Sequence, residues 1–287
     1  MIHIRCLQVL ILAILAVLPH MSAANAAGRL FTLTWDGVAQ SLAEIDVATG
    51  EATIIGGPYN DGFVGLTADP VAGTLIAYGL GTGRLMEFDP DTHVETQIGT
   101  LPALHVAGVN NMAYDPARRA ILVENIGSIV TFDRDTQEVL AISPTEVDGV
   151  HIDIGLHSLA FDSTSHTLYA WNHLGLLAFD PATGIGTSIV DRVPGIGSGL
   201  AFDATSGLLY TIDGTDNMLV SIDPVTGAIN QVSPLDLPQT SGMAFLPIPE
   251  PSAAVPLAIA VVAALPFYLR QLHRNSTPGA DASGLAG

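Results

Sequence analysis

The middle of the chain repeats one short unit five times, and this repeat restricts the fold more than any other feature. Each copy is an apolar run that closes on an aspartate and leads into a turn. The copies are LAEIDVATG (42–50), LMEFDPDTH (85–93), IVTFDRDTQ (129–137), LLAFDPATG (176–184) and LVSIDPVTG (219–227). Their aspartates, Asp46, Asp89, Asp133, Asp180 and Asp223, are 43, 44, 47 and 43 residues apart. Such a period predicts an array of similar structural units.

A second unit alternates with the first and has the same character. It reads GLTADPVAGTLIAYG, NMAYDPARRAILVEN, SLAFDSTSHTLYAWN and GLAFDATSGLLYTID. Both units place apolar, β-branched or aromatic residues around a turn in which Asp bonds backbone N–H groups, Pro presets φ and Gly accepts a positive φ. These are hairpin signals, and a helical 3.6-residue period is absent. Two hairpins per period make a four-stranded sheet, the size of a propeller blade of about 40–50 residues.

The two ends of the array predict the number of blades and how the ring closes. The first segment, LFTLTW through EATIIGG, supplies three strands, whereas the last, SGMAFLP, matches only the opening strand of a repeat. Pairing residues 243–245 with residues 31–34 would complete the first sheet and remove its exposed edges. The sequence therefore predicts an all-β domain over residues 28–247, a five-bladed β-propeller closed by a C-terminal strand.

Residues 1–26 have the pattern of a secretory signal peptide. Arg5 gives a positively charged start, residues 7–18 are apolar, and Ala24-Asn25-Ala26 fits the small-x-small pattern that signal peptidase reads. This apolar run is short for a membrane span, which needs about 20 residues. We expect cleavage after Ala26, which would also remove Cys6, the single cysteine. The mature chain would then lack disulfides and thiolate chemistry.

Residues 252–269 form an uncharged apolar run that is long enough to cross a bilayer as a transmembrane helix. Arg270 and Arg274 follow it, and by the positive-inside rule they would hold the C-terminus in the cytoplasm. The bulk of the chain would then lie outside the inner membrane. Residues 275–287, NSTPGADASGLAG, are expected to be a disordered tail.

The order of motifs over residues 249–274 resembles a known sorting signal. Pro249, Glu250 and Pro251 precede the apolar span, and Arg270 and Arg274 close it. This arrangement is similar to the PEP-CTERM domain of exosortase substrates, which occur in Gram-negative bacteria that make exopolysaccharide. The resemblance implies a transient membrane anchor, processed near the Pro-Glu-Pro by an exosortase-like enzyme. It also implies a final place at the cell surface or outside the cell.

The charge balance restricts the partners of the chain. There are nine arginines, no lysines and 28 acidic residues, which give a net charge of -19. Binding to nucleic acid needs a cationic face, so this balance argues against it. It fits a soluble, self-repelling surface.

The propeller topology places the Asp turns on one face and the remaining loops on the opposite face, where the central channel opens. On that second face, the loop 144–157 carries Glu146, Asp148, His151, Asp153 and His157, and His173 lies on a neighbouring loop. Imidazoles and carboxylates are transition-metal ligands, so His151, Asp153, His157 and His173 are candidates for a metal or ligand site. The spacing H-x-D-x3-H matches no established zinc motif, and exposed loop histidines commonly bind nothing.

Aligning the innermost strands predicts a ring of side chains at the channel mouth. This ring is Val64, Asn110, His157, Ser198 and Ser241. It lacks the two carboxylates that glycoside hydrolysis needs. It offers hydrogen-bonding groups for a sugar or for a column of water. Trp35, Tyr59 and Trp171 lie near the same face, where they could stack on a sugar or pack between blades.

These features predict an exported β-propeller at the cell surface or in the extracellular matrix. It would bind a ligand or act as a scaffold, and it would not be an enzyme. Its expected partners are an exosortase-like processing enzyme, the inner membrane through the C-terminal helix, and an exopolysaccharide. The alternative is a metal-dependent hydrolase or lactonase-like enzyme with its site on the face of the 144–157 loop. A third hypothesis is a purely structural matrix component. The sequence does not identify a cofactor, and both Ca²⁺ and Zn²⁺ stay open.

Overall fold

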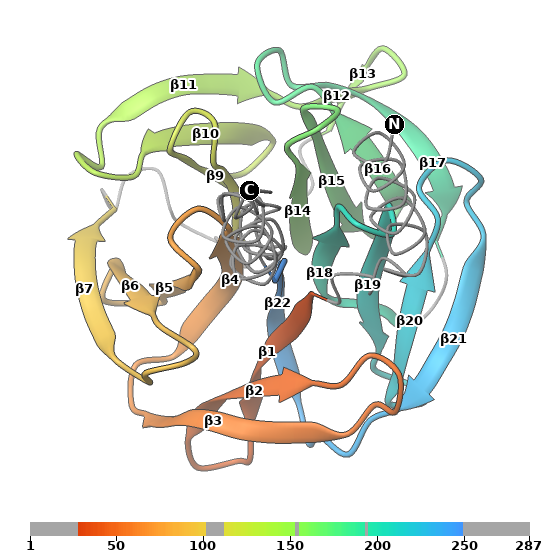
Figure 1. Cartoon of the computed structure of the whole chain (residues 1–287). Helices are drawn as coiled ribbons and strands as arrows, with labels where there is room; N and C mark the ends of the chain where they lie inside the picture. Colours follow the sequence, from red (N-terminus) through yellow and green to blue (C-terminus); the bar gives the residue numbers. More distant parts are fainter. Residues whose placement is uncertain (1–27, 102–111, 153–154, 193–194, 249–287) are drawn as a thin grey trace, which may run out of the picture. The chain divides into compact units, whose positions relative to one another are not determined.

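The computed structural model describes residues 28–101, 112–152, 155–192 and 195–248. Figure 1 shows five twisted sheets arranged in a ring around a central axis, and apart from one short parallel pair their strands are antiparallel. Every strand in the sequence repeat is present, and each repeat makes one sheet. The predicted all-β, five-bladed propeller is therefore confirmed for the part of the chain that the structure describes.

Each blade is named here by its order in the chain, with its innermost strand first. Blade 1 consists of β22 (Thr240–Leu246), β1 (Arg29–Trp35), β2 (Gln40–Ile45) and β3 (Ala52–Tyr59). Blade 2 consists of β4 (Phe63–Asp69), β5 (Thr74–Gly79), β6 (Arg84–Phe88) and β7 (Glu95–Thr100). Blade 3 consists of β8 (Met112–Asp115), β9 (Ala120–Glu124), β10 (Ser128–Asp133) and β11 (Val139–Pro144).

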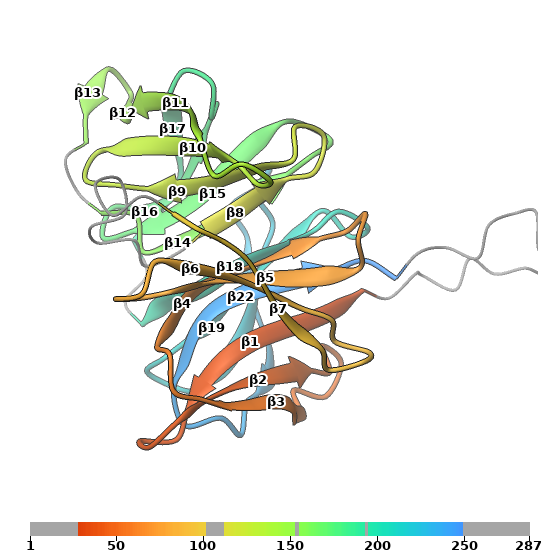
Figure 2. The same ribbon diagram turned by 90° about the vertical axis from the view of Figure 1, so that its left-hand side faces the viewer.

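The last two blades follow the same plan with one addition. Blade 4 consists of β14 (Ser158–Asp162), β15 (Thr167–Asn172), β16 (Gly175–Phe179) and β17 (Ile185–Asp191), and is extended by β12 (Glu146–Val147) and β13 (Val150–His151). Blade 5 consists of β18 (Ile196–Asp203), β19 (Leu208–Asp213), β20 (Met218–Ile222) and β21 (Ile229–Pro234). The hairpin β12–β13 lies at the periphery beside the end of β11 (Figures 1 and 2).

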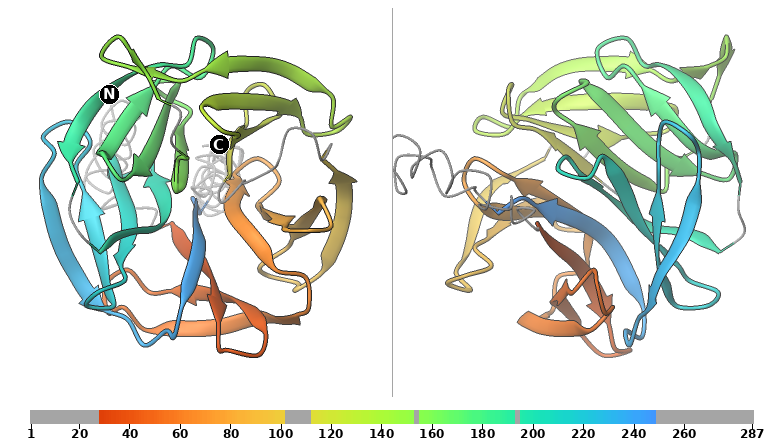
Figure 3. Two further views of the ribbon diagram at one scale, coloured as in Figure 1. Left: turned by 180° about the vertical axis from the view of Figure 1, so that it is seen from behind. Right: turned by 45° about the vertical axis from the view of Figure 1, so that its right-hand side comes forward.

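The ring closes as the two ends of the repeat array predict. Strand β22 pairs antiparallel with β1, with Phe31 opposite Ala244 and Leu30 opposite Phe245. The view from behind shows β22 lying beside β1 and completing the first blade (Figure 3). The innermost strands β22, β4, β8, β14 and β18 contact one another in this order around the axis. Closure pairs the inner edge of β1 with β22, so that blade 1 has four strands in its sheet as blades 2, 3 and 5 do.

The apolar core lies between the blades rather than in one central mass. Five clusters of buried side chains occur in the described residues, one at each interface between neighbouring blades. At the closing interface Tyr210 of blade 5 stacks on Phe245 of blade 1, with ring centroids 6.1 Å apart. Each blade therefore depends on both neighbours for burial of its faces, which makes the ring a cooperative unit.

The repeated aspartates have the turn role that the sequence predicts. Asp46 Oδ1 accepts hydrogen bonds from the backbone N–H groups of Ala48, at 2.8 Å, and Thr49, at 3.1 Å. The equivalent aspartates of the other four copies accept the same kind of bond. A bond from the Thr92 backbone N–H lowers the pKa of Asp89. These carboxylates are therefore occupied in organising turns.

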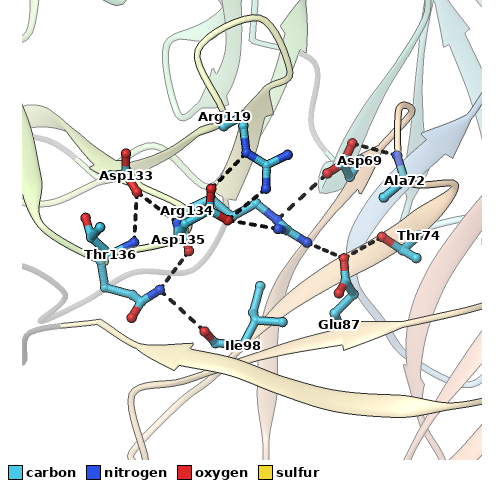
Figure 4. Close-up of polar contacts among 11 residues, drawn as sticks. Asp69, Ala72, Thr74, Glu87, Ile98, Arg119, Asp133, Arg134, Asp135 and Thr136 are labelled. Carbon is cyan, nitrogen blue, oxygen red and sulfur yellow. Dashed lines mark hydrogen bonds and ion pairs between the residues drawn. The ribbon is translucent and has the colours of Figure 1, made fainter.

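Charged side chains on the Asp-turn face join blade 2 to blade 3 (Figure 4). Arg134 reaches from the turn between β10 and β11 to Glu87 of β6, and its Nε lies 3.8 Å from Oδ2 of Asp69 at the end of β4. The side chain of Arg134 is 11% exposed and that of Asp69 is 1% exposed. This group, Arg134 with Asp69 and Glu87, is called the inter-blade strut below.

Glycine lets three of the inner strands pack closely around the axis. Gly65, Gly199 and Gly242 each have positive φ and each lies at a register shift in its strand. A Cβ on Gly242 would lie 2.7 Å from Leu66 N in blade 2, and one on Gly199 would lie 2.9 Å from Gly242 C in blade 1. The bulges at Gly242 and Gly199 are each capped by a threonine, because the Thr32 hydroxyl donates to Gly242 O and the Thr211 hydroxyl donates to Gly199 O.

The expected signal peptide, sorting segment and tail lie outside the described residues, as do Pro249, Glu250, Pro251, Arg270 and Arg274. From 28 to 248, leaving aside the three short gaps, no helix has the length and apolar character needed to span a bilayer. Those predictions about the two ends of the chain stay predictions.

Candidate functional site

The face on which the inner strands begin is called the mouth face below, and it carries His157 and His173, two of the predicted candidate residues. Antiparallel pairing brings the loop after β15 next to the start of β14, where Ser158 pairs with Trp171 and the His157 N–H donates to Trp171 O at 2.8 Å. Arg192, which follows β17, and Gly195, which precedes β18, lie beside them. Strands β14, β15 and β18 are neighbours in Figure 1 and contact one another. Blades 4 and 5 therefore meet at this point of the face.

A hollow of about 230 Å³ opens where these segments meet. It is lined by His157, Trp171, Asn172, His173, Arg192, Gly195 and Ile196. We call it the mouth-face hollow. The hollow brings together two of the predicted candidates, His157 and His173. It also contains four residues that the sequence did not single out: Asn172, Arg192, Gly195 and Ile196. A shared hollow makes these side chains available to one small ligand.

The third predicted histidine lies elsewhere. His151 belongs to β13, the outermost strand of blade 4, whereas His157 directly precedes β14, the innermost strand. The order β13-β12-β17-β16-β15-β14 separates them by five strand spacings of roughly 4.8 Å. The ring Nδ1 of His151 lies 2.8 Å from Thr145 O. The structure thus does not bring His151 to the other two histidines, and Asp153 lies outside the described residues.

Residues 144–157 do not form a single loop, because residues in the first half of this segment form two strands that extend the edge of the blade 4 sheet. Glu146 and Val147 pair in parallel with Ile185 and Gly186 of β17. Strand β12 thereby covers the edge of a strand that would otherwise expose its backbone groups. Across the described parts of the chain, no three His, Cys, Asp or Glu side chains gather closely enough to hold a metal ion.

The predicted ring at the channel mouth is only partly visible. Asn110 and the side chain of Ser198 lie outside what the structure describes. Val64 and Ser241 are half-buried and His157 is exposed. The Ser241 hydroxyl accepts a hydrogen bond from Gln40 Nε2 at 3.2 Å, and the same nitrogen donates to Phe63 O at 2.7 Å. Ser241 is therefore part of a junction between blades 1 and 2.

Of the three aromatic residues expected near this face, two belong to the core. Trp171 is 2% exposed and Tyr59 is 8% exposed. The Tyr59 ring packs edge-on against Phe63, with centroids 5.4 Å apart. Trp35 is 39% exposed and offers a free face. Inter-blade packing, rather than sugar stacking, explains Tyr59 and Trp171.

Glu124, at the end of β9, is a buried carboxylate that the sequence did not single out. It is 3% exposed, and its Oε1 accepts the Gly127 N–H at 3.2 Å. Burial raises its pKa above the ordinary value of 4.5, against the effect of hydrogen bonds from Gly127 and Leu156. Its position directly before a turn was the available signal. Its burial depends on the neighbouring blade, which no local pattern reveals.

This carboxyl predicts a specific pH dependence of stability. The folded state binds the Glu124 proton more tightly than the unfolded state does. The stability that the protonated Glu124 carboxyl contributes is therefore fully present below about pH 4.5. It is lost as pH rises through the higher pKa that Glu124 has in the folded state. Urea unfolding gives the free energy of unfolding of the wild type and of Glu124→Gln. We expect the wild-type value minus the variant value to fall as pH rises from 4 towards 8. A difference that is flat or rises with pH would contradict the burial assigned to Glu124.

Comparisons with known proteins support the fold. No protein-family model matches the chain, and no curated protein matches its sequence. A chain from the crystal structure of a nidogen/laminin complex matches with a TM-score of 0.53 and 15% identity, covering 77% of this chain and 99% of that one. A structural genomics protein of unknown function from Bacteroides thetaiotaomicron matches with a TM-score of 0.53 and 18% identity, covering 73% and 56%. The fold and the comparisons together define a five-bladed β-propeller.

Proposed function

We propose that this protein is an exported propeller that acts without catalysis, as a binding or scaffold module at the cell surface or in the extracellular matrix. Its ligand would be an exopolysaccharide, and an exosortase-like enzyme would process its C-terminus. The observation that carries the binding role is the mouth-face hollow, which gathers polar side chains of blade 4 and of its connection to blade 5 on a closed ring. Loops on a rigid scaffold are common places for binding residues.

The charge of the chain is compatible with a hydrated binding or scaffold module. A net charge of -19 keeps copies apart and the surface hydrated. In the described residues, Arg29, Arg84, Arg118, Arg119 and Arg134 all form ion pairs with carboxylates. Among the described residues, most of the positive charge is therefore paired with carboxylates of the blades. Recognition would depend on the few cationic groups left on the loops.

The export part of the proposal is tested by fractionating the producing cell and measuring the mass of the protein in each fraction. We expect the chain outside the cytoplasm without residues 1–26, together with a membrane-bound precursor. Replacing Pro249, Glu250 and Pro251 together by alanine should accumulate the precursor, because it removes the proposed processing motif. An uncleaved chain recovered only from the cytoplasm would contradict the proposal.

The metal-dependent hydrolase is the second candidate, and its support is the shared position of His157 and His173 at one hollow. A zinc site needs at least one further protein ligand. A rise in Tm with Zn²⁺ that disappears in His157→Ala would favour this candidate. A Tm that is unchanged by Zn²⁺ would favour the binding module.

A further inference from the structure

The polar side chains that line the mouth-face hollow are all hydrogen-bond donors or can become donors. Arg192 and Asn172 supply N–H groups, and His157 and His173 supply imidazoles. No aspartate or glutamate is among the described residues that line it. From this we infer that the hollow binds the carboxylate of a uronic acid unit in an acidic saccharide. The inference rests on the proposed binding function and adds the chemical class of its ligand.

Arg192 differs from the other described arginines. Five of the six arginines in the described ranges form ion pairs with Asp or Glu, and Arg192 forms none with a described residue. It is exposed and lines the hollow. A guanidinium presents its donors in a planar fork that matches a carboxylate in two parallel bonds. In a chain this acidic, an arginine without such a partner is available for an external anion.

Asn172 adds a donor that lacks a partner in the described structure. The residue is 1% exposed, and its Oδ1 accepts the Leu174 N–H at 2.8 Å. This bond fixes which side-chain atom is oxygen. The amide nitrogen, Nδ2, is buried and has no hydrogen-bond partner among the described residues. Leaving a buried donor unpaired costs free energy, so such a group calls for a water or ligand atom to complete it.

Two glycines hold the backbone around the hollow in place. Gly175 has φ of 129°, and a Cβ there would lie 1.9 Å from Val190 O. Gly195 has φ of 88°, and a Cβ there would lie 2.3 Å from Asp213 Oδ1. The loop after β15 therefore packs directly on the end of β17, and Gly195 packs directly on β19. A preorganised hollow loses less entropy when it binds a ligand.

Two carboxylates lie close by and limit the charge of the site. Asp213 is behind Gly195, and its Oδ1 accepts the Thr215 N–H at 2.9 Å. Asp191 is exposed at the end of β17, where it pairs with Gly175. Neither lines the hollow. They would repel a second negative charge, which favours a ligand with one carboxylate per sugar over a phosphate dianion.

The size of the hollow suits one sugar ring. Its volume of about 230 Å³ is below the roughly 300–1,000 Å³ of sites that enclose drug-sized ligands. A single hexuronate unit, with neighbouring units projecting into solvent, fits this limit. The hollow would therefore bind a single sugar unit of the polymer.

The test compares sodium glucuronate with glucose and with inorganic phosphate, titrated into the intact chain by calorimetry. We expect glucuronate to bind and glucose and phosphate to bind at least tenfold more weakly. Arg192→Gln should weaken glucuronate binding about tenfold or more, because it removes a hydrogen bond to a charged group. The matched control is Arg84→Gln, since Arg84 lies on the same face and pairs with Asp61 at 2.8 Å. It should bind as the wild type does.

A second variant tests glucuronate binding at the hollow without changing Arg192. Asn172→Asp retains the oxygen that accepts the Leu174 N–H and replaces the unpaired amide by an acceptor, so it should abolish glucuronate binding. Preference for phosphate, or equal loss in the Arg84 and Arg192 variants, would overturn the inference. If the intact chain binds exopolysaccharide but the Arg192 and Asn172 variants bind it equally well, the inference fails and the proposed function stands. If exopolysaccharide does not bind at all, both fail.

Discussion

Replacing Arg134 by methionine should lower the free energy of unfolding by about 3 kcal/mol, because it leaves buried carboxylates of the inter-blade strut without their partner. Asp69 is 1% exposed and Glu87 is 20% exposed, so water reaches Asp69 poorly once Arg134 is gone. Burial, reinforced by the nearby Asp69 carboxylate, raises the pKa of Tyr114 to about 12. The strut therefore holds negative charge in a desolvated position that depends on Arg134.

The matched control for this change is Arg119→Met. Arg119 also binds a carboxylate, that of Asp135 at 2.7 Å, and Figure 4 shows it beside the strut. Both side chains of this pair are about half exposed, so its loss should cost at most about 1 kcal/mol. Urea unfolding of the two variants measures the difference. Equal destabilisation would show that the strut is an ordinary surface ion pair.

Replacing Gly242 by alanine should destabilise the ring by about 3 kcal/mol. Its φ of 67° is strained for any residue with a Cβ, and the new Cβ would lie 2.7 Å from Leu66 N on the neighbouring inner strand. The conformational strain costs about 1–2 kcal/mol and the overpacking a further 1–3 kcal/mol. For a domain of this size, Tm should fall by roughly 6–12 °C.

Gly73→Ala separates the two costs. Gly73 has nearly the same φ, 74°, but nothing lies within 4 Å of the position of its Cβ. This control should lose only the 1–2 kcal/mol that the conformation costs. If the two alanine variants melt at the same temperature, the inner strands of blades 1 and 2 do not pack as closely as the structure has them.

The fold could be predicted from the sequence because its turns and its closure depend on local chemistry and on strand count. The five Asp turns are visible as a motif, and the strand missing from the first blade is visible at the other end of the array. Even so, the motif is incomplete in two copies. His93 and Gln137 take the positive φ that Gly50, Gly184 and Gly227 take elsewhere. In these two turns the N–H groups of His93 and Gln137 still donate to the carbonyls of Asp89 and Asp133, as the glycine N–H groups do in the other copies.

The candidate site was harder to predict because it depends on which loops meet. Motif spacing placed His151, Asp153 and His157 together in one loop, but the start of that loop pairs with the outer edge of β17 and carries His151 away. Arg192 lies in no repeated motif, and Asn172 is the last residue of its repeat unit, a position that differs between copies. Their significance comes from a missing ion pair and an unpaired amide, and both are visible only once the blades are packed.

Binding of an acidic saccharide at the mouth-face hollow can be followed by an NMR titration of the histidine rings. An oligouronate is added to the intact chain, and the ring signals are followed. We expect the signals of His157 and His173 to move together and saturate. The signals of His93 and His166, on the turns of the opposite face, should stay in place. Signals that move at His93 or His166 and not at the hollow would contradict it.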